Sequence, residues 1–127
     1  MTNTTSLIGR YKSDSVETMS PGRLIVALYD RLLLDLERAV VAIAANDVTA
    51  SHAALVHAQE IVSELHDALD VEGWPTGGAQ IAAIYEFLLR ELVTANVDKD
   101  VTRVMACHDL LTPLRDAWRE AAGISAT

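Results

Sequence analysis

The chain has 127 residues and a mass of 13.8 kDa, and half of its residues are hydrophobic, which is enough for one compact domain but not for two. Ten Lys and Arg residues against 18 Asp and Glu residues give a net charge of −8, so the chain repels nucleic-acid phosphates and anionic lipid. These numbers argue against nucleic-acid binding and favour an apolar, basic or protein partner.

Cysteine content and the N-terminal sequence indicate a reducing compartment. Cys107 is the sole cysteine, so the chain cannot form an internal disulfide or a thiolate cluster for zinc. Residues 1–6 have neither the basic start nor the apolar core of a signal peptide. Asp30, Arg31 and Asp35 interrupt the most apolar stretch before it reaches the length of a membrane span. We therefore expect a cytoplasmic protein without membrane insertion.

The chain opens with a polar segment that precedes the first helix. Residues 1–19 contain few large apolar side chains, so we expect a mobile N-terminal arm that docks on the rest of the chain or stays loose. Ser20 is a favoured N-cap and Pro21 suits the first helical position. An apolar-periodic run then continues to about Ala44, which predicts the first long helix.

A second helix follows after a short break. Asn46 and Asp47 interrupt the periodicity, Asp47 can cap the next helix, and that helix is predicted to end near Asp70. The segment 71–78 contains several glycines and a proline, which predicts a flexible connection instead of a continued helix.

Two more helices complete the expected fold. The third is predicted to close at Asn96, and the fourth to be capped by Asp98 and stopped by Gly123, with a structural kink at Pro113. Short joints between helices of about twenty residues favour antiparallel neighbours. The sequence therefore predicts an all-α, antiparallel four-helix bundle over residues 20–122, preceded by a short, partly ordered arm.

Metal chemistry finds little support in the sequence. A di-iron bundle needs paired Glu-x-x-His motifs, and no Glu of this chain has His three positions later. His57 with Glu60, and His66 with Asp70, have spacings that place two possible ligands on one helical face, which is weak support for a metal. We expect no metal and no cofactor, and a metal protein built on these histidines is left as a rival class.

Catalytic motifs are also lacking. Cys107 and His108 are neighbours, but adjacent helical positions point about 100° apart, so the imidazole cannot readily reach the thiol. The glycine-rich segment Gly73–Gly78 lacks the Gly-Lys-Ser/Thr ending of a phosphate loop. We expect that the chain is not an enzyme.

The first helix has more apolar surface than one core face requires. Its core stripe comprises Leu24, Ile25, Leu28, Tyr29, Leu32, Leu36, Ala39 and Ile43. Further apolar residues widen that stripe: Val26, Leu33, Leu34, Val40 and Val41. Either this helix is central to its own bundle or to a homodimer, or it borders a groove that binds an amphipathic or extended partner segment and that the arm covers when it is empty.

Ordered blocks of residues resemble a known family, the flagellar secretion chaperones called FliS. The blocks are Tyr11-x4-Val16-x-Thr18-Met19-Ser20-Pro21, Leu24-Ile25-Val26-Ala27-Leu28-Tyr29-Asp30, Gly77-Gly78 before Ile81 and Tyr85, Leu92-x-x-Ala95-Asn96, and Leu114-Arg115-Asp116-Ala117-Trp118. Their order and spacing cover nearly the whole chain from Tyr11 to Trp118.

The resemblance implies a cytoplasmic export chaperone that binds the disordered C-terminal segment of flagellin, prevents premature polymerisation and assists delivery to the export apparatus. The resemblance also suggests an export-gate component or a flagellar regulator as an additional partner. The resemblance implies no catalysis. The alternative is a helical homodimeric interaction module without flagellin binding, and the chain is expected to be a monomer or a weak homodimer.

The resemblance and the amphipathic pattern together nominate a partner-binding groove. By position in the family's motifs the candidates are Ile25, Leu28, Tyr29, Leu32 and Tyr85. The helix after Asp47 adds one wall through Val62, Leu65 and Leu69, which are nominated from amphipathicity. In the arm, Ile8 and Tyr11 are expected to gate or dock on the groove. Several candidates must also belong to the core, and the sequence does not say which side of the first helix faces outward.

Overall fold

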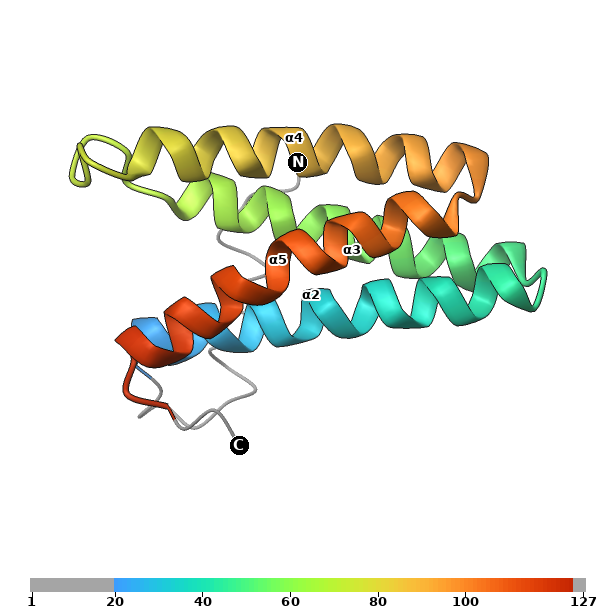
Figure 1. Ribbon diagram of the computed structural model, residues 1–127, viewed down its shortest axis with the longest axis horizontal. Coiled ribbons are helices and arrows are strands. Elements are labelled where there is room, and N and C mark those ends of the chain that lie inside the picture. Colours follow the sequence, from blue (N-terminus) through green and yellow to red (C-terminus); the bar gives the residue numbers. More distant parts are fainter. Residues whose placement is uncertain (1–19, 125–127) are drawn as a thin grey trace, which may run out of the picture.

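The computed structural model describes residues 20–124 and contains four long helices. Helix α2 spans Pro21–Ala44, α3 spans Val48–Ala68, α4 spans Gly78–Asp98 and α5 spans Val101–Ala121. Figure 1 shows them running alternately in opposite directions, with short connections at the two ends of the bundle. The predicted all-α antiparallel bundle is confirmed. The predicted arm, with Ile8 and Tyr11, lies outside the described residues.

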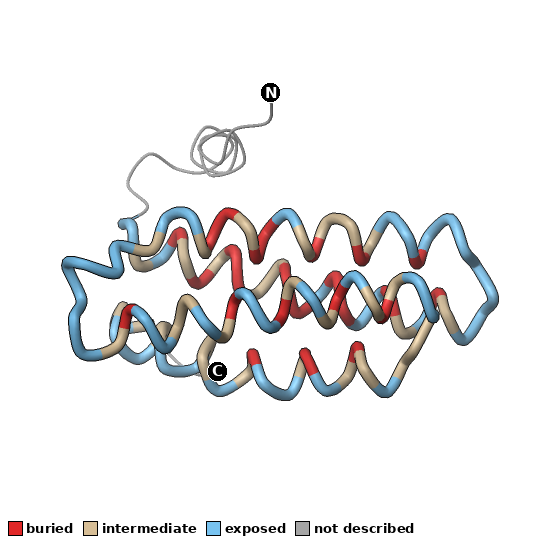
Figure 2. The backbone as a smooth tube through the Cα atoms, turned by 90° about the horizontal axis from the view of Figure 1, so that it is seen from above, coloured by how far each residue is buried: buried red, intermediate tan, exposed pale blue. Residues whose placement is uncertain are grey.

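Each helix packs against two neighbours. The contacting pairs are α2 with α3, α2 with α5, α3 with α4, and α4 with α5, so α2 and α4 lie across a diagonal of the bundle. The first turn of α2 meets the end of α5, where a Cβ on Gly22 would lie 3.3 Å from the Cβ of Ala122. In Figure 2 the buried residues recur along each helix at intervals of about one turn, as expected for helices with one apolar side.

Side-chain caps explain where α2 and α3 begin. The Ser20 hydroxyl accepts from the backbone N–H of Arg23 at 3.2 Å, and the Asp47 carboxylate accepts from that of Ala50 at 3.0 Å. Each bond satisfies an N–H that the first helical turn leaves without a partner. Both starts agree with the sequence prediction. Helix α3 ends at Ala68, two residues before the predicted end.

The connection between α4 and α5 differs from the prediction. Helix α4 continues past Asn96 to Asp98, and Lys99 adopts a left-handed conformation with φ 50°. The Lys99 ammonium donates to the Asn96 side-chain oxygen at 2.7 Å, which favours this turn. Asp100 caps α5 by accepting from the Arg103 N–H at 3.1 Å. Predicting Asp98 as the cap was therefore wrong, because two equally suitable aspartates lie two residues apart.

The segment between α3 and α4 is organised into hydrogen-bonded turns, where the sequence predicted a flexible connection. The Asp70 carboxylate accepts from the Gly73 N–H at 2.9 Å, and the Trp74 carbonyl accepts from the Gly78 N–H at 2.8 Å. A Cβ on Gly78 would lie 2.8 Å from the Cα of Val71. The backbone at the two ends of this loop therefore approaches so closely that position 78 requires glycine.

Pro113 does not end α5, which is helical from Val101 to Ala121. Proline removes the N–H that would bond to the Asp109 carbonyl four residues earlier. Pro113 and Asp109 are both exposed, so water can reach that carbonyl and limit the cost.

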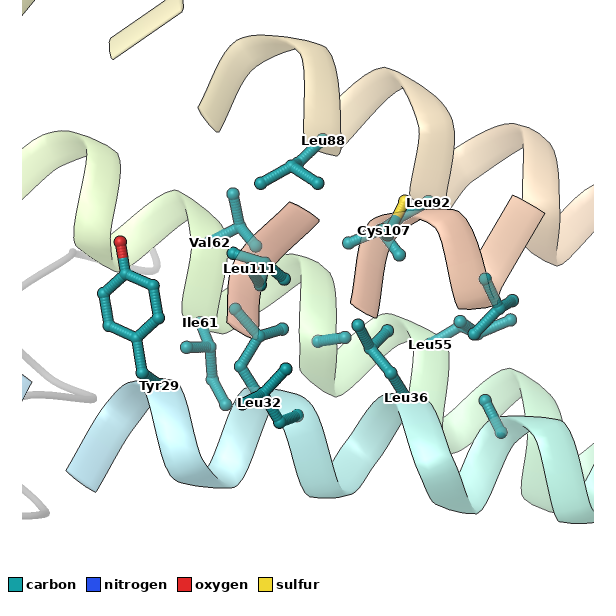
Figure 3. Close-up of a cluster of buried hydrophobic side chains, with 14 of the residues drawn as sticks. Tyr29, Leu32, Leu36, Leu55, Ile61, Val62, Leu88, Leu92, Cys107 and Leu111 are labelled. Atoms are coloured by element: carbon teal, nitrogen blue, oxygen red, sulfur yellow. The ribbon is translucent and has the colours of Figure 1, made fainter. Parts of the chain in front are cut away.

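All four helices contribute to one core. Figure 3 shows large buried side chains from each helix converging on the interior. The fully buried members with the largest volumes are Tyr29, Tyr85, Leu28, Leu32, Leu36, Leu55, Ile61, Leu88, Leu92, Leu111, Val62 and Val104.

The wide apolar surface of α2 has two parts. Val26 and Leu33 are 3% and 5% exposed, so this part is buried in the bundle itself. Leu34 and Val41 remain 37% and 69% exposed. The central position of α2 therefore accounts for one part of the surface, and the other part is available to a partner.

Candidate partner-binding pocket

An apolar pocket lies at the end of the bundle where α2 begins and α3 and α5 end. It has a volume of about 530 Å³. Its walls come from all four helices and from the loop before α4: Pro21, Gly22, Leu24, Ile25, Leu65, Ala68, Leu69, Asp70, Gly73, Trp74, Tyr85 and Trp118. Asp70 is the only charged residue among them. Such a pocket suits apolar side chains of a partner.

Four of the predicted groove residues line this pocket: Ile25, Leu65, Leu69 and Tyr85. Ile25 and Leu69 are half-buried and pack against the edge of the core, so a partner can reach them. Leu65 and Tyr85 are 3% and 2% exposed and form its floor.

The other four predicted groove residues lie in the core. Leu28, Tyr29, Leu32 and Val62 are each 0% exposed and belong to the central apolar cluster. They pack within the chain and do not line the pocket. A direct partner contact by these four remains a prediction.

A hydrogen bond organises the pocket floor. The hydroxyls of Tyr29 and Tyr85 lie 2.6 Å apart and form one hydrogen bond between α2 and α4. Burial raises the pKa of both tyrosine hydroxyls, and for Tyr85 the nearby Tyr29 raises it further. Both side chains are therefore neutral at physiological pH, and the cluster presents no charge to the pocket.

Trp74 is one of the lining residues that sequence reasoning missed. It is 41% exposed in the loop before α4, and its ring lies so close to Gly77 that a Cβ there would be 2.4 Å from a ring carbon. The sequence did contain a signal for it, because a tryptophan between Gly73 and Pro75 is expected in a loop, where it can be exposed and can bind a partner. Its place beside Pro21, more than fifty residues away, came only from the fold.

The two histidines considered as metal ligands bind carboxylates of neighbouring helices instead. His57 in α3 hydrogen-bonds Asp35 in α2, and the His66 Nε2 lies 2.9 Å from a Glu86 carboxylate oxygen in α4. Neither bonds the acid that shares its predicted helical face. Within residues 20–124 no group of three or more His, Cys, Asp or Glu residues is arranged to hold a metal ion.

The side chains of Cys107 and His108 have different surroundings. Burial raises the pKa of the Cys107 thiol to about 11, so it carries almost no thiolate at neutral pH. His108 Nε2 lies 2.8 Å from a Glu37 carboxylate oxygen of α2.

Of the helices that the structure describes, none has the length and hydropathy of a membrane span.

Comparisons with known proteins find one family of relatives, the flagellar secretion chaperones. A family model described as flagellar protein FliS matches residues 4–125. The chain is 33% identical over 113 residues to the flagellar secretion chaperone FliS of Bacillus subtilis (strain 168), covering 87% of this chain and 82% of that one. It is 30% identical over 122 residues to the flagellar secretion chaperone FliS of Salmonella typhimurium, covering 92% and 90%.

A third relative extends the agreement. The flagellar secretion chaperone FliS of Escherichia coli (strain K12) is 29% identical over 108 residues, covering 84% of this chain and 79% of the relative. These relatives are chaperones and not enzymes, which agrees with the expectation from the sequence. The chain therefore belongs to the FliS family of flagellar secretion chaperones.

Proposed function

We propose that this protein acts in the cytoplasm as an export chaperone for flagellin. It binds the disordered C-terminal segment of flagellin, keeps flagellin from polymerising early and assists its delivery to the export apparatus. The observation that carries the proposal is the apolar pocket at the bundle end, where Ile25, Leu69 and Trp74 are accessible. Family membership supports the chaperone role.

The physical basis is coupled folding and binding. A disordered, amphipathic segment gains order when its apolar residues enter a preformed pocket, and its self-association surface is then covered. Such binding typically buries about 1,000–3,000 Å² and costs about 2–5 kcal/mol in ordering. The rigid floor of the pocket, with its hydrogen-bonded tyrosines, keeps the chaperone's own ordering cost low.

Isothermal titration calorimetry with the C-terminal segment of flagellin from the same organism, at two temperatures, tests this proposal. We expect a one-to-one complex with a negative heat-capacity change, because apolar surface is buried on binding. Absence of heat at both temperatures, together with absence of a complex on gel filtration, would overturn it.

A matched pair of aromatic substitutions tests the position of the pocket. Trp74 and Phe87 are 41% and 44% exposed, but Phe87 lies on α4 outside the pocket. Trp74→Ala should weaken flagellin binding about tenfold or more, as loss of an aromatic anchor does, whereas Phe87→Ala should leave it unchanged. Equal effects of the two variants would place the binding site elsewhere.

The arm and any additional partner belong to the same proposal. Deleting residues 2–19 should raise the binding of a hydrophobic dye or change the affinity for flagellin if Ile8 and Tyr11 gate the pocket. No change in either quantity would remove the arm from the mechanism.

An export-gate component or a flagellar regulator remains the proposed type of second partner.

A homodimeric interaction module is the alternative function. Exposed apolar side chains on α4 favour it, since Phe87, Val93 and Val97 are 44%, 50% and 77% exposed. Light scattering over a range of concentrations would reveal a dimer through a rising mass. A constant monomer mass together with flagellin binding would exclude this alternative.

A further inference from the structure

Helix α5 crosses the bundle obliquely, from α4 at its start to α2 at its end (Figure 1). Near its start, Arg103 lies 2.8 Å from a Glu91 carboxylate oxygen of α4. Near its end, Arg115 and Arg119 lie 2.8 Å and 3.6 Å from the two carboxylate oxygens of Asp30 in α2. The last turns of α5 are therefore fastened to α2 by one carboxylate.

Trp118 is the α5 residue that lines the apolar pocket. It follows Arg115 by three residues and directly precedes Arg119, so the two arginines that bind Asp30 flank the tryptophan within about one helical turn. The ring is half-buried and packs against the edge of the core. A movement of this turn would shift the ring and change the shape of the pocket.

The last turns of α5 are only loosely coupled to the rest of the helix. Pro113 has no N–H to donate to the Asp109 carbonyl, so one hydrogen bond between the turns on either side of it is missing. Trp118 lies five residues beyond Pro113. The position of the ring therefore depends strongly on the contacts that these last turns make with α2.

Those contacts include a close approach of small residues. A Cβ on Gly22 would lie 3.3 Å from the Cβ of Ala122, and apolar contact of this kind has no preferred direction. The ion pairs do have a direction, because Arg115 Nη1 donates to Asp30 at 2.8 Å and its Nε donates to Asp116 at 2.8 Å. The carboxylate of Asp30 therefore supplies the directional contact that fixes this end of α5.

We propose that Asp30 is a positioning residue of the pocket: its carboxylate binds Arg115 and Arg119 and thereby holds Trp118 in place as the α5 wall. Asp30 itself does not line the pocket. The consequence for binding rests on the proposed flagellin-binding function, since loss of the Asp30 charge weakens binding without removing a side chain that touches the segment. The position of the ring can be measured without any partner.

Two matched variants test this role. Asp30→Asn removes the charge and keeps the size of the side chain. Glu91→Gln is the control, since it breaks an α5 ion pair of the same 2.8 Å length outside the pocket and changes the net charge equally. Both are made in a Trp74→Phe background, which leaves Trp118 as the sole tryptophan of the two in the chain. Circular dichroism with thermal unfolding measures the stability of each variant.

The fluorescence of Trp118 separates positioning from a purely structural role. We expect Asp30→Asn to shift the emission to longer wavelength and to increase quenching by acrylamide, and Glu91→Gln to change neither. High salt should have the same effect as Asp30→Asn on the protein that retains Asp30, because salt screens partly exposed ion pairs. Unaltered emission and quenching in Asp30→Asn would overturn the inference. If Asp30→Asn does not fold, Arg115→Gln, which breaks the shorter pair from the α5 side, decides by the same readout.

Calorimetry with the flagellin C-terminal segment, in proteins that retain both tryptophans, tests the consequence for binding. We expect Asp30→Asn to weaken binding about fivefold and Glu91→Gln less than about twofold. Equal affinities of the two variants would also overturn the inference. If the unchanged protein does not bind the segment at all, the proposed function is overturned, whereas the fluorescence still decides whether Asp30 positions Trp118.

Discussion

The hydroxyl oxygens of Tyr29 and Tyr85 lie 2.6 Å apart inside the bundle and join α2 to α4, the helices that face each other across its diagonal. Both side chains are almost fully buried, at 0% and 2% exposed. Buried hydroxyls need hydrogen-bond partners, and these two supply one another. The pair therefore links two helices that have no shared packing edge, directly beneath the pocket.

Removing one of the two hydroxyls should destabilise the bundle. Tyr85→Phe leaves the Tyr29 hydroxyl buried without that partner, so the free energy of unfolding should fall by about 1–2 kcal/mol. Urea denaturation followed by circular dichroism measures this. The double variant Tyr29→Phe/Tyr85→Phe should lose less than the sum of the two single variants, because both hydroxyls leave together. Strictly additive losses would show that the bond contributes nothing.

The pair of His66 and Glu86 should make stability depend on pH. The hydrogen bond to the Glu86 carboxylate is the main cause that raises the pKa of His66, burial lowers it, and Asp67 raises it again. A raised pKa in the folded state means that the stabilisation is fully present below the unfolded value of about 6.5 and is lost as pH rises through the folded value.

The variant Glu86→Gln isolates this effect. We expect the urea midpoint of the unchanged protein to exceed that of Glu86→Gln at pH 5.5, and the difference to shrink at pH 8. Both proteins contain the other histidines, so the difference between their urea midpoints cancels the contribution of those histidines. An NMR titration of the His66 ring should give a midpoint above the ordinary histidine value in the unchanged protein and a lower one in the variant. A difference between the two proteins that is constant with pH would contradict the assignment.

Cys107 should be unreactive in the folded protein. It is 2% exposed, and burial raises the pKa of its thiol to about 11, so both access and thiolate content are low at pH 8. Labelling with a thiol reagent at pH 8 should be slow in buffer and fast in denaturant. Since Cys107 is the sole cysteine, the labelling rate reports directly on opening of the bundle. Equal rates in the two conditions would show that the α5 core is open.

Substituting Gly78 should destabilise the start of α4. Alanine favours a helix over glycine by about 0.5–1 kcal/mol, but its Cβ would lie 2.8 Å from the Cα of Val71 and 3.0 Å from its carbonyl oxygen. Backbone shifts of this kind cost about 1–3 kcal/mol. We expect Gly78→Ala to lower the free energy of unfolding by about 1 kcal/mol, measured by urea denaturation. A gain in stability would mean that the loop moves away at no cost.

The helices themselves could be predicted from the sequence because their signals are local. The caps Ser20 and Asp47 bond N–H groups three residues away, and these helix starts were predicted correctly. The start of α5 was predicted wrongly because Asp98 and Asp100 carry the same local signal. The choice between them depends on Lys99, which adopts a left-handed conformation that is unfavourable for a residue with a Cβ.

The candidate site could be predicted only in part. The sequence nominated apolar residues of the first helix, of which Ile25 lines the pocket, and it identified the family by resemblance. It could not separate Ile25, which is accessible, from Leu28 and Leu32, which are fully buried on the same stripe. It also treated the loop that carries Trp74 as a mere connection.

The sequence by itself determined the four helices, because helix formation depends on residues within about four positions of each other. The short connections determined their antiparallel order, and the ordered residue blocks determined the family. Only the tertiary structure decided which apolar residues a partner can reach. The pocket joins Pro21 to Trp74 and Trp118. Exposure at such places depends on how the helices pack against one another, and the pattern along one helix does not contain that information.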